Sequence, residues 1–186
     1  MSSWGGGQKS VSQRGFSMIE LMVAIVVMGV GLLGGIVVIA VSTSNNGKSK
    51  LHTTAATLAE STMEKILAIP QSAAGALTQT SITDCAGNAF IIETAAGGAA
   101  IIPNGFAFSG SVNFSQPPVP NYSMQYVACS NGAAGTVYDI RWRIDPGPTP
   151  STQLVTVSAK PGIGNQAVAA AQFTLPVTLH ELRGNF

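Results

Sequence analysis

The sequence predicts an α+β protein in which a long N-terminal helix spans a membrane and packs against an antiparallel β-sheet head. Two observations predict the helix. Residues 21–41 contain no charged side chain, and apolar residues then recur at helical spacing as far as Ile69. The head is predicted by the second half of the chain, where apolar and polar residues alternate as in half-buried strands.

The first part of the predicted helix, residues 16–41, is long enough to cross a membrane. Its 26 residues exceed the roughly 20 helical residues that a hydrocarbon core requires. It contains Gly29, Gly31, Gly34 and Gly35, each of which costs about 1 kcal/mol relative to alanine in a helix. Three explanations stay open: close helix packing through a GxxxG pair, local unwinding when the helix leaves lipid, and the ordinary tolerance of membrane helices for glycine.

The second part, residues 42–70, is expected to be an amphipathic continuation of the same helix. Its apolar or small residues fall on one helical face. These are Leu51, Ala55, Leu58, Thr62, Ile66 and Ile69. Pro70 is expected to end the helix. A break at Asn45-Asn46-Gly47 is the main alternative to one continuous helix.

Residues 71–186 are expected to form the β-rich head. The alternating segments are 106–114, 123–130, 137–144, 154–159 and 173–182, with Pro176 indicating an edge or irregular position for the last. We expect the third and fourth of these to pair as antiparallel neighbours across the Asp145-Pro146-Gly147-Pro148 turn. Residues 71–104 are interpreted as a variable connection from helix to sheet.

The strand 137–144 has two distinct faces. One carries only apolar and aromatic side chains and is expected to lie in the core. It consists of Tyr138, Ile140, Trp142 and Ile144. The other carries Asp139, Arg141 and Arg143, and we expect Asp139 and Arg141 to form a solvated face.

Composition limits the function classes. Charged residues make up 9% of the chain, apolar residues 46%, and the formal net charge is +1. A nearly neutral chain has no electrostatic footprint for nucleic acid. The acids form no paired-carboxylate signature, His52 and His180 are isolated, and no nucleophile motif occurs. We therefore expect no enzyme, no metal site and no cofactor.

Two cysteines, Cys85 and Cys129, lie in the predicted head. An exported head favours a disulfide between them, whereas a reducing compartment favours two buried thiols. If they are joined, the closed loop stabilises the fold by about 4 kcal/mol in the chain-entropy treatment. Both possibilities stay open at this point, although the disulfide is the interpretation we favour.

The start of the apolar helix carries the most specific signal in the chain. A polar leader containing Lys9 and Arg14 ends in Gly15, Phe16 opens the apolar segment, and Glu20 follows as its one acid. An acidic residue at mid-bilayer costs roughly 2.5–3.5 kcal/mol, so it usually has a partner. A positive amine released by cleavage before the phenylalanine is the obvious candidate.

This arrangement resembles the class III signal of type IV prepilins and pseudopilins. The resemblance implies a leader of residues 1–15, cleavage between Gly15 and Phe16, N-methylation of Phe16, and an assembly role for Glu20. It implies a single-pass inner-membrane protein with its N-terminus in the cytoplasm and its head in the periplasm. Charge alone leaves this orientation nearly tied, because lysines also follow the span.

The resemblance also implies partners and a function. The partners are a prepilin peptidase that also methylates, other pilins or pseudopilins, the inner-membrane assembly platform, the lipid bilayer before assembly and, as a further option, a tip adhesin. Residues 138–143 and 58–64 look most like PilV-type minor pilins and the related minor pseudopilins of type II secretion. The leading hypothesis is a minor pilin of a type IV pilus machine. The alternatives are a minor pseudopilin of a type II secretion or DNA-uptake system and a single-span envelope ligand-binding protein.

Overall fold

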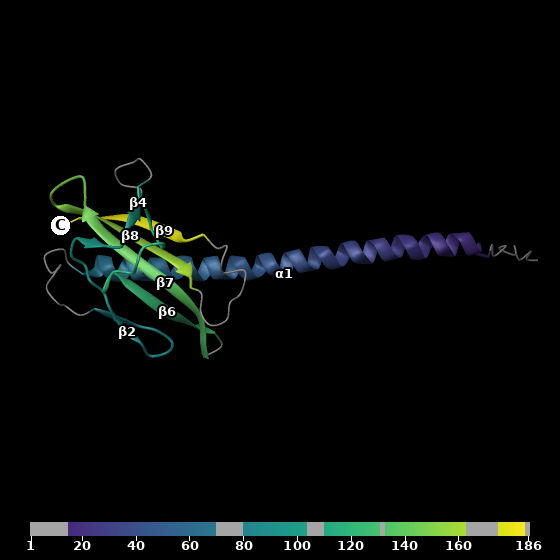
Figure 1. The fold of residues 1–186 in the computed structure, drawn as a ribbon, viewed down its shortest axis with the longest axis horizontal. Coiled ribbons are helices and arrows are strands. Elements are labelled where there is room, and N and C mark those ends of the chain that lie inside the picture. Colours follow the sequence, from purple (N-terminus) through teal and green to yellow (C-terminus); the bar gives the residue numbers. More distant parts are fainter. Residues whose placement is uncertain (1–14, 70–79, 104–109, 131–132, 163–174, 185–186) are drawn as a thin grey trace, which may run out of the picture. The chain divides into compact units, whose positions relative to one another are not determined.

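The computed structural model describes residues 15–69, 80–103, 110–130, 133–162 and 175–184. It contains one α-helix and nine strands within these ranges (Figure 1). The chain divides into two compact units, Met1–Thr43 and Ser44–Phe186.

The helix, α1, runs from Met18 to Ala68 without a break. The expected helix is therefore confirmed, and the alternative break at Asn45-Asn46-Gly47 does not form. Threonines in its middle satisfy their hydroxyls within the helix by donating to the carbonyl four residues earlier. Thr43 Oγ1, for example, lies 2.9 Å from the Ile39 carbonyl oxygen.

The first unit consists of the N-terminal half of this helix. Its large apolar side chains, from Phe16 to Val41, are all at least 55% exposed within the chain. In the part of the chain that the structure describes, α1 is the one helix long and apolar enough to cross a membrane.

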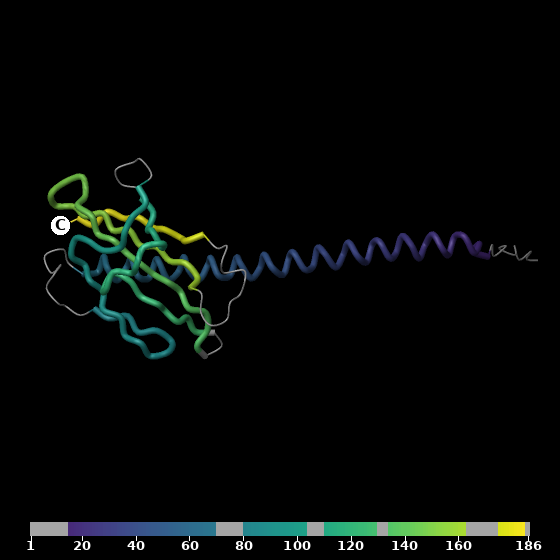
Figure 2. The backbone as a smooth tube through the Cα atoms, in the orientation of Figure 1, coloured from purple at the N-terminus to yellow at the C-terminus, as the bar shows by residue number. Residues whose placement is uncertain are grey.

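The second unit contains the rest of α1 and all the strands. Its main sheet is antiparallel and has five strands, with β7 (Ala133–Pro146) paired to β3 (Gly97–Gly98), β6 (Ser123–Ser130) and β8 (Thr152–Pro161). The last strand, β9 (Val177–Gly184), pairs with β8. Figure 2 shows the backbones of β6 to β9 running side by side.

Two small hairpins complete the second unit. One pairs β1 (Ser81–Thr83) with β2 (Ala89–Ile91), and the other pairs β4 (Ile101–Ile102) with β5 (Ser111–Val112). The expectation that 71–104 is only a connection is wrong, because four short strands, β1 to β4, lie in its described part. The expected strand 106–114 is also wrong at its end, since β5 stops at Val112. Residues 104–109 lie outside the described residues.

The other expected strands are confirmed with small shifts of their ends. The predicted β7–β8 pairing forms, with Ile140 opposite Ala159 and Trp142 opposite Val157. The last strand begins at Val177 rather than 173, and residues 173–174 lie outside the described residues. β9 ends the strand order, which agrees with the edge alternative, and Pro176 itself lies just before the strand.

The core lies between α1 and one face of the main sheet. Ala55, Ala59, Met63 and Ile66 of the helix are buried against the apolar face of β7 and β8. Trp142 is completely buried, and its indole N–H donates to the Glu93 carbonyl oxygen at 2.9 Å. Burial of a large aromatic side chain with its one donor satisfied stabilises the second unit by several kcal/mol.

The opposite face of β7 is covered at Asp139 and Arg141, so the expectation that these two side chains are solvated is wrong, while Arg143 further along stays partly exposed. Asp139 and Arg141 are each 6% exposed and form a bidentate ion pair, with Arg141 Nη2 2.8 Å from Asp139 Oδ2. The segment after β5 covers them. The Gln116 carbonyl oxygen accepts from Arg141 Nη1 at 2.6 Å, and the Phe114 ring centroid lies 5.0 Å from Arg141 Cζ.

A disulfide ties the first hairpin to the main sheet. Cys85, in the β1–β2 turn, is bonded to Cys129 of β6, with a Cα–Cα distance of 5.3 Å. Next to it, Asp84 accepts hydrogen bonds from the backbone N–H groups of Ala86, Asn88 and Val127. Burial raises the pKa of the Asp84 carboxyl, but these bonds and one from the Asn88 side chain together lower it below its ordinary value.

Candidate processing and assembly site

The predicted processing site lies immediately before the first turn of α1. Gly15 and Phe16 are in neither helix nor strand, and both are exposed. Ser17 then opens the helix, since its carbonyl oxygen accepts from the Glu20 and Leu21 N–H groups at 3.0 and 3.2 Å. A peptide bond just outside a helix is open to a processing enzyme, whereas a bond within the helix would first require unwinding.

Glu20 lies in the first turn of α1. This position favours a carboxylate, because unpaired N–H groups give a helix N-terminus a partial positive charge. Its side chain is exposed, and it forms no ion pair among the residues that the structure describes. The carboxylate is therefore open to a partner from outside the chain.

The four glycines of the apolar segment share one structural property. A Cβ atom added to Gly29, Gly31, Gly34 or Gly35 would meet no atom within 4 Å outside its own helical surroundings. Intramolecular packing therefore does not require glycine at these positions. Gly31 and Gly35 are four residues apart and so lie on one side of the helix. All three explanations offered for the cluster remain compatible with this geometry.

The two cysteines lie in the second unit and take no part in the processing site. Their disulfide resolves the alternative that the sequence left open, because the pair is bonded. No group of three or more His, Cys, Asp or Glu residues able to hold a metal occurs within the described ranges.

Sequence reasoning missed one residue that holds the end of α1. Arg183 of β9 is 5% exposed, and its Nη1 donates to the carbonyl oxygens of Ile66 and Ile69 at 3.2 and 3.1 Å. Its Nη2 donates to the Gln153 side chain. The last carbonyls of a helix need external donors. The sequence signals this need at Pro70 but gives no indication that an arginine more than a hundred residues later supplies it.

Comparison with known protein families bears directly on the N-terminal signal. Residues 11–36 match a family model described as the prokaryotic N-terminal methylation motif. This match supports a class III signal of the type IV pilin and pseudopilin kind at the N-terminus of the chain. The matched range contains Gly15, Phe16, Glu20 and the glycine cluster. Comparisons with curated proteins and with solved structures gave no significant match.

For a pilin-like protein, the motif and the fold agree. The family model covers the signal and most of the apolar segment, and α1 continues from that segment into the core of an antiparallel β head. This motif and the apolar helix favour membrane anchoring followed by entry into a filament. A class III signal also implies processing by a prepilin peptidase and assembly with other pilins.

Proposed function

We propose that this pilin-like protein is a minor pilin of a type IV pilus machine. Residues 1–15 would be its leader, 16–41 its membrane span, 42–70 its amphipathic helix and 71–186 its periplasmic head. The observation that carries the proposal is the methylation motif at the start of a membrane-length helix that continues into the head.

Processing creates the charge on which assembly depends. Hydrolysis between Gly15 and Phe16 releases the leader carboxylate and a new amine on Phe16. N-methylation leaves that amine a secondary amine, which still carries a positive charge at neutral pH. The cation then lies four residues before Glu20, at the apolar end of the helix.

Glu20 of a neighbouring subunit neutralises this amine in the filament. Two opposite charges in a helix bundle of low dielectric attract strongly, although the cost of removing both from water offsets much of the gain. The pair therefore contributes more to the register between subunits than to net stability. The exposed apolar side chains of residues 21–41 leave lipid and pack against equivalent helices.

The head fits an oxidising compartment. A disulfide persists in the periplasm and on cell surfaces but is rare in a reducing cytoplasm. The bond between Cys85 and Cys129 therefore supports an orientation with the leader in the cytoplasm and the head outside. Assembly with the inner-membrane platform would draw the subunit out of the bilayer.

Mass spectrometry of the mature protein, isolated from membranes and from sheared filaments, tests the proposal. We expect an N-terminus at Phe16 that carries one methyl group, in both fractions. A working protein that retains Met1 would contradict the proposal and favour the single-span ligand-binding alternative. Correct processing with a requirement for a secretion channel rather than for pilus assembly genes would favour a pseudopilin.

A further inference from the structure

Two lysines of α1 lie where the helix enters the second unit. Lys48 and Lys50 are the first charged side chains after Glu20, since residues 21–47 contain none. Neither lysine forms an ion pair in the ranges that the structure describes. Lysines directly after a span are uncommon on the exported side, because positive residues favour the cytoplasmic side of a membrane. In the orientation proposed above, these two charges therefore call for a physical reason.

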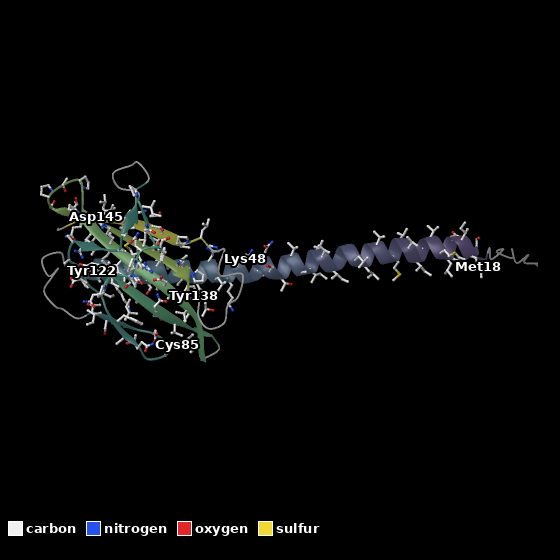
Figure 3. All side chains as sticks on the ribbon, viewed as in Figure 1. Met18, Lys48, Cys85, Tyr122, Tyr138 and Asp145 are labelled. Atoms are coloured by element: carbon white, nitrogen blue, oxygen red, sulfur yellow. A yellow bond between two sulfur atoms is a disulfide. The ribbon has the colours of Figure 1, made fainter. Side chains whose placement is uncertain are left out.

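The second of these lysines borders a groove between α1 and the β6–β7 end of the sheet. The groove has a volume of about 370 Å³, which lies within the range of small-molecule sites. Lys50 and Thr54 of the helix line it together with Thr136 and Tyr138 of β7, so its lining combines one ammonium group with three hydroxyl groups. Figure 3 labels Tyr138 of this sheet and Lys48 of this stretch of helix.

No acidic side chain balances the lysine in the groove. The lining contains no carboxylate, and residues 125–138, which supply its sheet side, contain no charged residue. The two acids close to these strands have other partners. Asp84 accepts hydrogen bonds from backbone N–H groups, and Asp139 is ion-paired on the opposite face of β7. His52 follows Lys50 by about 200° around the helix and does not line the groove.

The length of α1 brings these lysines to a membrane surface. Lys48 follows Glu20 by 28 residues of unbroken helix, which is about 42 Å at 1.5 Å per residue. A bilayer with both headgroup layers is about 40–45 Å thick. When Glu20 lies at one surface, Lys48 therefore lies at the other, and Lys50 about 3 Å beyond it. Side chains of a helix tilt toward its N-terminus, so both lysine stems start in the direction of the headgroups.

We propose that this groove binds the headgroup of an anionic phospholipid, such as phosphatidylglycerol, while the subunit is in the membrane. The inference rests on the proposed function, which puts the head on the periplasmic side of the inner membrane. The Lys50 ammonium pairs with the phosphate, and the hydroxyls bond the polar end of the headgroup. A zwitterionic headgroup fits less well, because the lining has no carboxylate to receive its positive group.

Such a contact holds the head at the membrane surface before assembly. The attraction of one lysine to an anionic surface corresponds to a factor of about five in affinity. It is weak enough to break when the subunit leaves the bilayer. The contact requires no second copy of the chain, so it is compatible with a subunit that is present in few copies.

Native mass spectrometry of the full-length protein tests the lipid preference. The protein is extracted from membranes in mild detergent and offered equal amounts of phosphatidylglycerol and phosphatidylcholine. We expect it to retain phosphatidylglycerol in preference. Lys50→Gln should lower this preference about fivefold, and Lys50→Arg should keep it. The control Lys65→Gln, in the last turn of α1 and outside the lining, should leave it unchanged.

Two further variants separate the groove from general surface charge. Lys48 has the same charge and nearly the same depth as Lys50 but lies outside the lining, so Lys48→Gln should lower the preference less than Lys50→Gln. Thr136→Val keeps every charge and should also lower it, whereas Thr57→Val, on an exposed part of α1, should not. Equal losses for the two lysine variants would overturn the groove as the site, and so would an unchanged preference in Thr136→Val.

Inorganic phosphate identifies the source of the ligand. At the concentration of the lipid it should not displace phosphatidylglycerol, and displacement would reassign the groove to a free anion. If the chain is processed at Phe16 and enters filaments but shows no preference for phosphatidylglycerol, the lipid site is wrong and the pilin role stands. If the chain is never processed at Phe16 and never enters filaments, the proposed function itself fails.

Discussion

The two units of this chain obtain their stability in opposite ways. In the first, apolar side chains such as Leu33 and Val38 are more than 60% exposed within the chain. In the second, residues such as Trp142 and Val157 are completely buried against α1. The same helix contributes to both units. The head thus contains its own core, whereas the N-terminal half requires lipid or neighbouring helices to cover it.

This difference predicts which property a mutation in each unit will change. Substitutions in the first unit should change processing and assembly while the fold of the head persists. Substitutions in the second unit should change the free energy of unfolding while cleavage at the leader persists. Each of the following predictions tests this separation.

Gly15→Leu should have the largest effect, a complete block of cleavage. The processing enzyme must approach the backbone closely before Phe16, and a branched side chain obstructs that approach. The measurement is N-terminal sequencing together with the mass of the intact protein. Gly47→Leu in α1, where a Cβ also has open space, is the control that should still be cleaved. Sequencing that still begins at Phe16 in Gly15→Leu would contradict the prediction.

Glu20→Ala should leave cleavage intact and lower incorporation into filaments about tenfold or more, which corresponds to about 1.4 kcal/mol. The lost carboxylate is the proposed partner of the Phe16 amine of a neighbour. Immunoblots of sheared and cell-bound fractions measure the ratio, with Glu60→Ala as an acid-to-alanine control on the same helix that should lose less. Normal filament entry by Glu20→Ala would exclude this role for the carboxylate.

Replacing both cysteines by serine should lower the free energy of unfolding of the full-length protein in detergent by about 2–4 kcal/mol. The bond joins the β1–β2 turn to β6, so its loss frees the hairpin that Asp84 also holds. Denaturant unfolding followed by near-ultraviolet circular dichroism measures the change. Cleavage at Gly15 should be unaffected, and impaired cleavage would mean that processing of the first unit depends on the fold of the second.

The sequence allowed the prediction of those features that depend on neighbouring residues. Membrane length, the class III signal and the helical spacing up to Ile69 are all local, and so is the alternation of Tyr138, Ile140 and Trp142. The turn at Asp145-Pro146-Gly147-Pro148 is local as well. The ends of the helix and of the long strands differ from the predicted ones by a few residues.

Features that depend on distant parts of the chain could not be predicted. Alternation alone assigns Asp139 and Arg141 to solvent, whereas the segment that contains Phe114, some 25 residues earlier in the chain, covers them in the structure. Strand β3 consists of two glycines with positive φ, and a Cβ on Gly98 would lie 2.5 Å from the Trp142 carbonyl oxygen. A pairing made possible by the absence of side chains leaves no periodic pattern to detect.

The smallest predicted effect concerns the pH dependence of the head. Because the folded-state pKa of Asp84 lies below its ordinary value of 3.8, its contribution to stability is fully present above that value. It is lost as the pH falls through the lowered folded pKa. Asp84→Asn should therefore be less stable than wild type at neutral pH, and the difference should shrink at acid pH. The comparison requires unfolding curves of both full-length proteins in detergent between pH 2 and 7, values that bracket the ordinary carboxyl range.

Asp139→Asn is the matched control for this experiment, because Asp139 has a different partner, Arg141 of the covered face. The Asp84 variant should lose hydrogen bonds that hold the β1–β2 turn to β6, so backbone amide exchange should rise at Asn88 and Val127. The Asp139 variant should leave those two amides protected. If the difference in the free energy of unfolding between wild type and Asp84→Asn stays constant from neutral to acid pH, the negative charge of Asp84 does not account for its contribution to stability.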